Sequence, residues 1–344
     1  MTNSETTADH RLAVLDGWRA VSILLVLATH LLPLGPKSWQ VNAMTGPMGM
    51  ALFFTLSGFL ITRFLLYHDS VVDFIIRRVF RIVPLAWTGL LIALPLAGAT
   101  ADVWWRNLFF IANVPPAHLT EIAGHYWSLC LEMQFYVGIA LLVAVLGVRG
   151  LYVVPLLGLA VTLHRVWEGA AIDIVTWQRA DEILAGCTLV MVVDGRFGER
   201  PKVWLRKLNT PTLIVLLAMC SHPSTGWLNY LRPYAAALLV GSTLYGAWPP
   251  LMALLESRLF AYIAKISFAL YVIHHILMHT WLGMADDKLM RYVKRPLLVA
   301  ATFALAHLST FHFEQRWIDL GKLFSARWNA WRGEAKPVTG SSGP

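Results

Sequence analysis

Long apolar stretches, separated by short polar ones, run along almost the whole chain. Runs of roughly 17 to 22 residues with few charges recur, and a helix of that length is long enough to cross a bilayer. The predicted spans lie at about 12–34, 47–67, 82–100, 125–146, 150–166, 178–194, 210–222, 232–248, 262–282 and 294–313. The predicted fold class is therefore all-α, a polytopic transmembrane helical bundle of about ten spans.

The composition excludes a water-soluble globular protein. Of the 344 residues, 57% are hydrophobic and only 14% are charged, whereas soluble domains carry about 25% charged residues. The three cysteines all fall within apolar runs without metal-ligand spacing, and we interpret them as small core residues. Because no linker-like segment interrupts the chain, residues 1–330 are predicted to form one integral membrane domain. Residues 331–344 are predicted to be a disordered cytoplasmic tail.

The formal net charge of +8 is explained by basic residues that gather on one side of the membrane. Ten spans put both termini on one side, and if that side is the cytoplasm, 17 Lys and Arg residues lie inside and nine outside. This bias agrees with the positive-inside rule. The predicted partner is therefore the lipid bilayer, with no nucleic acid, and the predicted location is a multi-pass membrane protein with both termini cytoplasmic.

Two ionisable residues lie in the first apolar run, RAVSILLVLATH. Charges within spans are costly and are functional candidates by default. Arg19 and His30 are eleven residues apart, which places both on one helix face and about 16 Å apart along its axis. An arginine and a histidine aligned in this way on one helix face suit an elongated anionic ligand whose reactive end reaches His30. An equally compatible interpretation is that Arg19 extends to the interface and His30 is a hydrogen-bonded core residue.

A second basic motif, FIIRRVFRIVP, lies at the expected cytoplasmic surface. Arg78 and Arg81 are three residues apart and so are neighbours on one helix face. Their planar guanidinium groups suit bidentate binding of phosphate. Taken alone, however, this motif fits a positive-inside anchor or a site for lipid headgroups better than it fits a site for a phosphate-containing ligand.

Two further spans carry polar side chains. Glu132 and Tyr136 share a face of HYWSLCLEMQFYVG, where the carboxyl group needs a partner such as a proton or His30; a structural polar network is the alternative. Tyr271 and His274 or His275 belong to a polar stripe in ISFALYVIHHILMH, for which helix–helix hydrogen bonding is the simplest role.

The segment QRADEILAG carries three charged residues at a helix end. Arg179, Asp181 and Glu182 are close in sequence, and the simplest prediction is a local cap held by salt bridges.

Several of these segments resemble acyltransferase family 3, whose integral membrane enzymes are best known for O-acetylating bacterial polysaccharides and some small glycosylated molecules. The resemblance is carried, in order, by LDGWRAVSILLVLATH, SGFLIT, RRVFRIVP, HYWSLCLEMQFY, RADEILAG, ISFALYVIHH and HFEQRWIDLGK. It extends from about residue 12 to 322. This sequence departs from the family pattern with Cys130 for a common Ser, Met133 for a second Glu, and Arg316 for a common Pro. The first two changes argue against a mechanism with paired carboxylates.

The resemblance implies transfer of an acyl group, most often acetyl, from acyl-CoA to a hydroxyl. The implied acceptor is a glycan, a lipid-linked sugar or a glycosylated small molecule, and the implied location is a bacterial inner or plasma membrane. His30 would be the general base or acyl carrier, and Glu132 would orient it. Arg19, Arg78 and Arg81 would bind acetyl-CoA. Tyr136, Tyr271 and His274 would bind the acceptor substrate. No residue is assigned to a metal. The alternative function is a transporter or exporter with a buried His/Glu/Arg pathway.

Overall fold

The computed structural model describes residues 3–68, 70–246 and 248–331. Within these residues every regular element is a helix, which confirms the all-α fold class. The α-helices are α1 (Asn3–Leu31), α2 (Val41–Tyr67), α3 (Val71–Leu96), α4 (Ala101–Leu108), α5 (Trp127–Leu146), α6 (Val154–Glu168), α7 (Asp181–Val193), α8 (Glu199–Arg206), α9 (Thr210–Ser221), α10 (Arg232–Thr243), α11 (Pro249–Leu255), α12 (Arg258–Met278), α13 (Lys288–Leu308) and α14 (Gln315–Trp331).

Each of the ten predicted segments falls on a helix, but the count of ten spans is not confirmed. Seven helices of the described residues are long and apolar enough to cross a membrane. An eighth span results if α8 and α9, which meet at 93°, are taken together. The 13 residues of α7 and the 12 of α10 are about 18–20 Å long at 1.5 Å per residue, whereas the hydrocarbon core is about 30 Å thick.

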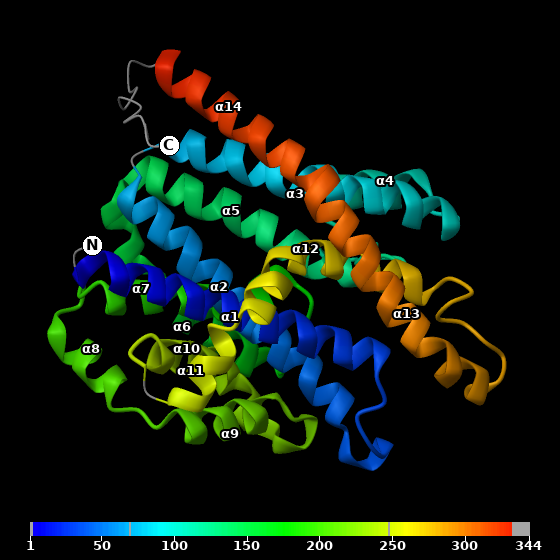
Figure 1. Cartoon of the computed structure of the whole chain (residues 1–344). Coiled ribbons are helices and arrows are strands. Elements are labelled where there is room, and N and C mark those ends of the chain that lie inside the picture. The colour runs from blue at the N-terminus through cyan, green and yellow to red at the C-terminus, as the bar shows by residue number, and fades with distance from the viewer. Residues whose placement is uncertain (1–2, 69, 247, 332–344) are drawn as a thin grey trace, which may run out of the picture.

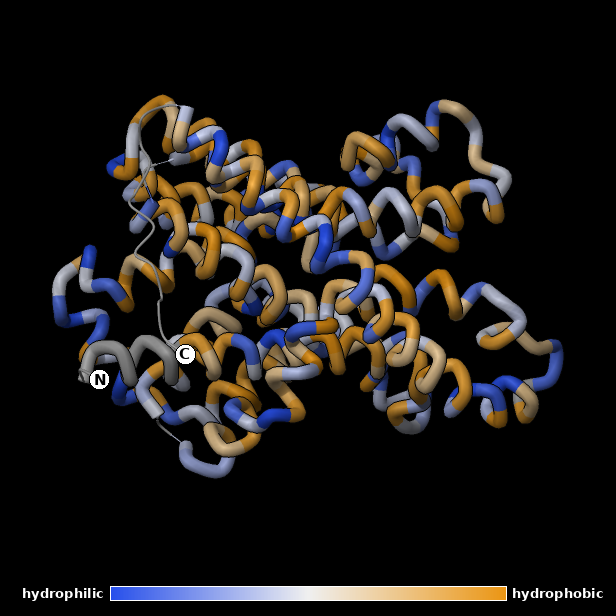
Figure 2. The backbone as a smooth tube through the Cα atoms, turned by 45° about the horizontal axis from the view of Figure 1, so that its top comes forward, coloured by the Kyte–Doolittle hydropathy of each residue, from blue (hydrophilic) through white to orange (hydrophobic). Residues whose placement is uncertain are grey.

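The helices form one bundle in which α1 begins and α14 ends at the same end (Figure 1). Hydrophobic positions cover most of the long helices, while hydrophilic ones gather in the loops at both ends of the bundle (Figure 2). The protein is therefore a multi-pass integral membrane protein. Apart from Trp331, the predicted tail lies outside the described residues.

Two glycines explain why α2 and α7 lie in close contact at the centre. A Cβ atom on Gly58 would lie 1.9 Å from the carbonyl oxygen of Ile183, and one on Gly186 would lie 2.0 Å from that of Thr55. Small residues allow helix backbones to approach in this way in membranes. The SGFLIT and RADEILAG motifs thus pack against each other, and Ser57, next to Gly58, is left facing a cavity.

The C-terminal helices cover α3. A π-helical turn, Ser309–Glu314, joins α13 to α14, and α14 packs along α3. Ser325 on α14 donates a hydrogen bond to Asp73 on α3, which also accepts one from Arg77 at 2.8 Å. This packing brings α14 next to the two arginines of the RRVFR motif.

Candidate active site

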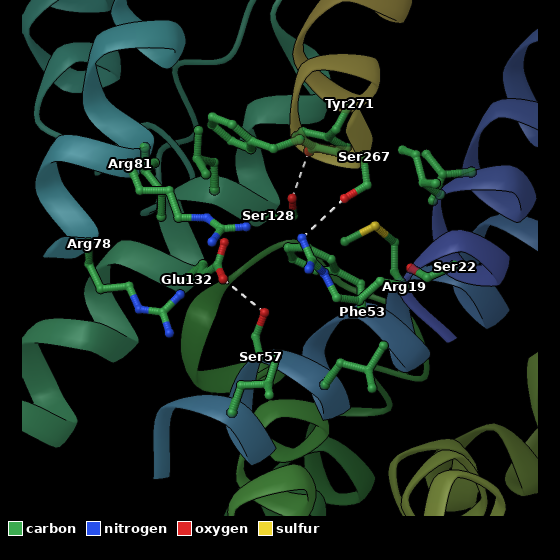
Figure 3. Close-up of a pocket in the computed structure, with 18 of the residues that line it drawn as sticks. Arg19, Ser22, Phe53, Ser57, Arg78, Arg81, Ser128, Glu132, Ser267 and Tyr271 are labelled. Carbon is green, nitrogen blue, oxygen red and sulfur yellow. Dashed lines mark hydrogen bonds between the residues drawn. The ribbon is translucent and has the colours of Figure 1, made fainter. Parts of the chain in front are cut away.

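A cavity of about 240 Å³ lies between α1, α2, α3, α5 and α12 (Figure 3). Six of the eight residues predicted for the site line it: Arg19, Arg78, Arg81, Glu132, Tyr136 and Tyr271. Figure 3 shows the three guanidinium groups pointing inward, toward Glu132. Residues from four helices, far apart in sequence, are therefore brought to one space.

Arg19, Arg78 and Arg81 differ in whether another side chain pairs with their positive charge. Arg19 forms an ion pair with Asp16 at 3.0 Å and donates to Ser267 at 3.3 Å. Within the described part of the chain, neither Arg78 nor Arg81 makes an ion pair or a hydrogen bond through its side chain. Arg78 lies over the ring of Tyr136, 5.6 Å from its centroid. Unpaired guanidinium groups in a low-dielectric cavity strongly favour an anionic ligand.

A second cavity, of about 200 Å³, extends the basic region. Arg78 and Arg81 line both cavities, and the second one adds Arg77 from α3 and Lys322 from α14. No acidic residue is among its lining residues. The two cavities thus meet at Arg78 and Arg81. Of the four cationic side chains around the second, Arg77 forms an ion pair with Asp73 and Lys322 one with Asp319, both at 2.8 Å. Neither Arg77 nor Lys322 was predicted from the sequence to belong to the site.

Glu132 is held by two hydroxyl groups. Its Oε1 atom accepts hydrogen bonds from Ser57 at 2.8 Å and from Tyr136 at 2.5 Å. The prediction that Glu132 orients His30 is not supported, because the hydrogen-bond partner of the His30 ring is His274. A catalytic role for Glu132 stays a prediction.

His30 and His274 form a pair with a defined tautomer. The Nδ1 atom of His274 lies 2.7 and 3.0 Å from the carbonyl oxygens of Tyr271 and Leu270. Since carbonyl groups only accept, this nitrogen carries the proton of a neutral His274, and its Nε2 atom is an acceptor. His30 Nδ1, 3.2 Å away, is then the donor. The Nε2 atom of His30 is left with a free lone pair, as a base or nucleophile requires.

Three more histidines surround this pair. The His275 ring centroid is 5.4 Å from that of His30, 4.6 Å from that of His125 and 4.7 Å from that of His279. His275 was predicted only as an alternative to His274, and neither His125 nor His279 was predicted for the site. An ionisable residue beside or within a span was the available signal for both.

Tyr271 joins the cavity to the histidines. It lines the cavity, where its ring stacks on Phe53 at 6.4 Å. Its ring centroid is also 5.1 Å from that of His125 and 5.9 Å from that of His274. His30 and His274 are not lining residues, so a ligand in the cavity must extend beyond its lining to reach His30, and Tyr271 is the lining residue whose ring contacts His274.

The charged residues near 180 belong to a different, fully buried network. Arg179 binds Glu182 at 3.1 Å, the local salt bridge that was predicted. Glu182 also binds Arg232 of α10 at 2.7 Å, and Asp181 binds Arg165 of α6. The predicted local salt bridge is therefore present, but it is part of a larger network that ties three helices together. Among the described residues, no group of His, Cys, Asp or Glu has the geometry of a metal site.

Comparison with known proteins identifies the class. The model of acyltransferase family 3, described as an acyltransferase domain, matches residues 12–311. The chain therefore belongs to this family.

The similar curated proteins include O-acetyltransferases. Peptidoglycan O-acetyltransferase OatA of Listeria monocytogenes is 26% identical over 349 residues, covering 86% of this chain and 54% of the relative. O-acetyltransferase OatA of Staphylococcus aureus (strain NCTC 8325) is 27% identical over 212 residues, covering 52% of this chain and 34% of the relative. This chain thus spans about half the length of the Listeria protein. No solved structure matches it significantly.

Proposed function

We propose that the protein transfers an acetyl group from acetyl-CoA to a hydroxyl group of a glycan. The main observation in favour is the cavity whose unpaired Arg78 and Arg81 lie at one end and whose Tyr271 contacts the histidines at the other. Membership of an acyltransferase family supports transfer of an acyl group as the type of reaction. The names of the relatives supply peptidoglycan as a first acceptor to test.

The donor is proposed to enter at the second cavity. Arg77, Arg78, Arg81 and Lys322 would bind the phosphates of coenzyme A, which are too highly charged to enter the apolar bundle. The pantetheine arm would lie in the first cavity against Phe53 and its apolar neighbours. Since acetyl-CoA is made in the cytoplasm, this end and both termini are assigned to the cytoplasmic side of a bacterial inner membrane.

His30 is the proposed base. Its Nε2 atom would remove the hydroxyl proton as the oxygen attacks the thioester carbon, forming a C–O bond. The C–S bond then breaks, and the proton held by His30 passes to the sulfur, so that coenzyme A leaves as a thiol. In the alternative sequence, Nε2 attacks the thioester carbon, the C–S bond breaks and coenzyme A leaves as a thiolate. An acceptor hydroxyl then attacks the acyl-histidine, the C–N bond breaks as the C–O bond forms, and the released imidazole takes the hydroxyl proton. Tyr136 and Tyr271 would contact the substrates within the cavity.

The test is acetyl transfer by the purified full chain in nanodiscs. Radiolabelled acetyl-CoA and soluble peptidoglycan fragments are supplied, and release of thiol and label on the glycan are measured. Label on a sugar hydroxyl, with one thiol released per ester formed, is the expected result. If neither acetyl-CoA nor a longer acyl-CoA binds or reacts, the proposal is wrong, and transport becomes the better explanation of the polar interior.

Replacing Arg78 or Arg81 with alanine is expected to weaken donor binding. Each loses a charge-assisted contact of about 1.5–3 kcal/mol, which corresponds to an increase in KM for acetyl-CoA of roughly 10- to 150-fold. The exposed Arg258 on α12 lines neither cavity, and Arg258→Ala is the control with unchanged KM. With S-acetylpantetheine, which lacks the nucleotide phosphates, the difference between wild type and variants should disappear. A difference that persists with this truncated donor would contradict phosphate binding.

Replacing His274 with leucine is expected to lower kcat by roughly 100-fold without changing the affinity for coenzyme A. Leucine cannot accept the proton of His30 Nδ1, so the tautomer that exposes Nε2 is no longer fixed. The variant His274→Gln offers an amide oxygen as acceptor and should recover part of the activity. Steady-state kinetics over a range of pH check this, because the leucine variant should also shift the pH dependence of kcat. Equal activity of the two variants would exclude His274 as the group that positions His30.

A further inference from the structure

His125 has a buried imidazole without a hydrogen-bond partner. The residue belongs to the turn Gly124–Tyr126 before α5, and only 5% of its surface is exposed. Both ring nitrogens are buried, and neither makes a hydrogen bond within the described chain. Leaving a buried polar group unpaired costs about 1–3 kcal/mol. An unpaired group of this kind in a folded protein therefore calls for an explanation.

Packing alone does not explain a histidine here. Tyr271 donates a hydrogen bond to the backbone carbonyl oxygen of His125, and any residue at this position provides that oxygen. The imidazole itself lies beside the backbone of Val272, without a hydrogen bond of normal geometry, and makes ring contacts. Its centroid lies 4.6 Å from that of His275, 5.1 Å from that of Tyr271 and 5.4 Å from that of His274.

The position of His125 relates it to the proposed base. The rings of His30 and His125 both contact the rings of His274 and His275, with His30 at centroid distances of 5.2 and 5.4 Å. His30 reaches this pair from α1, and His125 reaches it from the turn before α5. A group that meets His30 on the side of Tyr271 therefore also comes close to His125.

The neighbouring donors are already engaged. The Nδ1 atoms of His274 and His275 lie within hydrogen-bond distance of backbone carbonyl oxygens, at 2.7 Å for Tyr271 and 2.9 Å for Ile122. His30 Nδ1 is bonded to His274. Ser128 and Tyr271 are bonded to each other at 2.6 Å. Among these described groups, the N–H of His125 alone has no acceptor at normal hydrogen-bond geometry.

We propose that the N–H of His125 is the oxyanion donor of the acyl transfer. The inference rests on the proposed function. When the hydroxyl oxygen or His30 Nε2 attacks the thioester carbon, the electron pair of the C=O bond moves to oxygen. The N–H of His125 donates to this oxyanion. The pair returns as the C–S bond breaks. In the hydroxyl route the sulfur takes the proton that His30 removed, and in the histidine route it leaves as a thiolate, so His125 keeps its own proton in both. A donor held ready in a dry site needs no reorganisation at the moment of reaction.

The test compares four variants of the full chain in nanodiscs. His125→Phe keeps an aromatic ring but has no donor, and kcat for acetyl-CoA is expected to fall by about 10²- to 10³-fold with unchanged KM. His125→Asn and His125→Gln place an amide N–H near the positions of Nδ1 and Nε2, and at least one should recover roughly a tenth of wild-type kcat or more. His125→Met is the donor-free alternative should the phenylalanine variant not fold. Thermal midpoint and coenzyme A affinity establish that each variant is folded.

The outcomes separate this inference from the function on which it rests. If wild type transfers acetyl groups and folded His125→Phe or His125→Met is equally active, the oxyanion role alone is wrong. The oxyanion role is also wrong if His125→Asn and His125→Gln are both as inactive as the donor-free variants. The shape of the histidine side chain, and not its N–H donor, would then be what the reaction requires. If wild type itself neither binds nor consumes acyl-CoA, the proposed function fails and this inference with it.

Discussion

His30→Ala is expected to remove acetyl transfer almost completely, with kcat lower by at least about 10³-fold, within the range of a lost general base. Alanine has no group to take the hydroxyl proton or to carry the acetyl group. Affinity for coenzyme A should be unchanged, because His30 does not line the cavity that is proposed to hold the donor. Thiol release in nanodiscs gives kcat, and calorimetric titration with coenzyme A gives the affinity.

A second histidine provides the matched control. The Nδ1 atom of His279 lies 2.8 Å from the carbonyl oxygen of His275, and its Nε2 lies 3.7 Å from Glu121, whose side chain is 89% exposed. The side chain of His279 is 8% exposed and its ring contacts that of His275. His279→Ala therefore removes an imidazole of the same cluster without removing the partner of His30, and should leave kcat nearly unchanged. Substantial activity in a folded His30→Ala variant would exclude His30 as base and as carrier. Label retained on wild type but not on His30→Ala would support the acyl-histidine route.

The helices and most of the cavity residues could be predicted because membranes impose simple rules. Apolar runs mark helices, and all ten predicted segments are helical. Charged residues in spans are expensive, which is why Arg19, Arg81 and Glu132 could be selected, and all three line the cavity. The number of spans could not be fixed, because α7 and α10 are short helices whose polar ends are neutralised by other helices.

The contacts between distant helices were harder to predict. Periodicity shows which residues share a face of one helix but not how two helices are rotated about their axes. For that reason Glu132 was expected beside His30, whereas the packing of α1 against α12 places His274 there. Two other residues could not be predicted because they depend on how distant helices pack. His125 precedes α5, and Lys322 reaches the second cavity only because α14 packs along α3.

Glu182→Leu is expected to lower the free energy of unfolding by about 3–5 kcal/mol, the usual cost of removing one partner from a buried ion pair. The carboxyl group bonds Arg179 at 3.1 Å and Arg232 at 2.7 Å, and all three side chains are at most 2% exposed. Without it, two buried guanidinium groups lose their counter-charge. Reversible unfolding in mixed micelles, or the thermal midpoint in detergent, measures the loss.

An exposed ion pair provides the comparison. Glu199 binds Lys202 at the same 3.1 Å, but its side chain is 70% exposed, and such pairs contribute about 0–1 kcal/mol. Glu199→Leu should therefore leave the midpoint nearly unchanged. The double variant Glu182→Leu with Arg232→Met should be less destabilised than the sum of the two single variants, because only Arg179 is then left uncompensated. Strict additivity, or similar midpoints for Glu182→Leu and Glu199→Leu, would mean that the packing of α7 and α10 does not depend on this network. The expected coupling would instead make the buried charges the reason that two helices too short to span a bilayer are stable inside one.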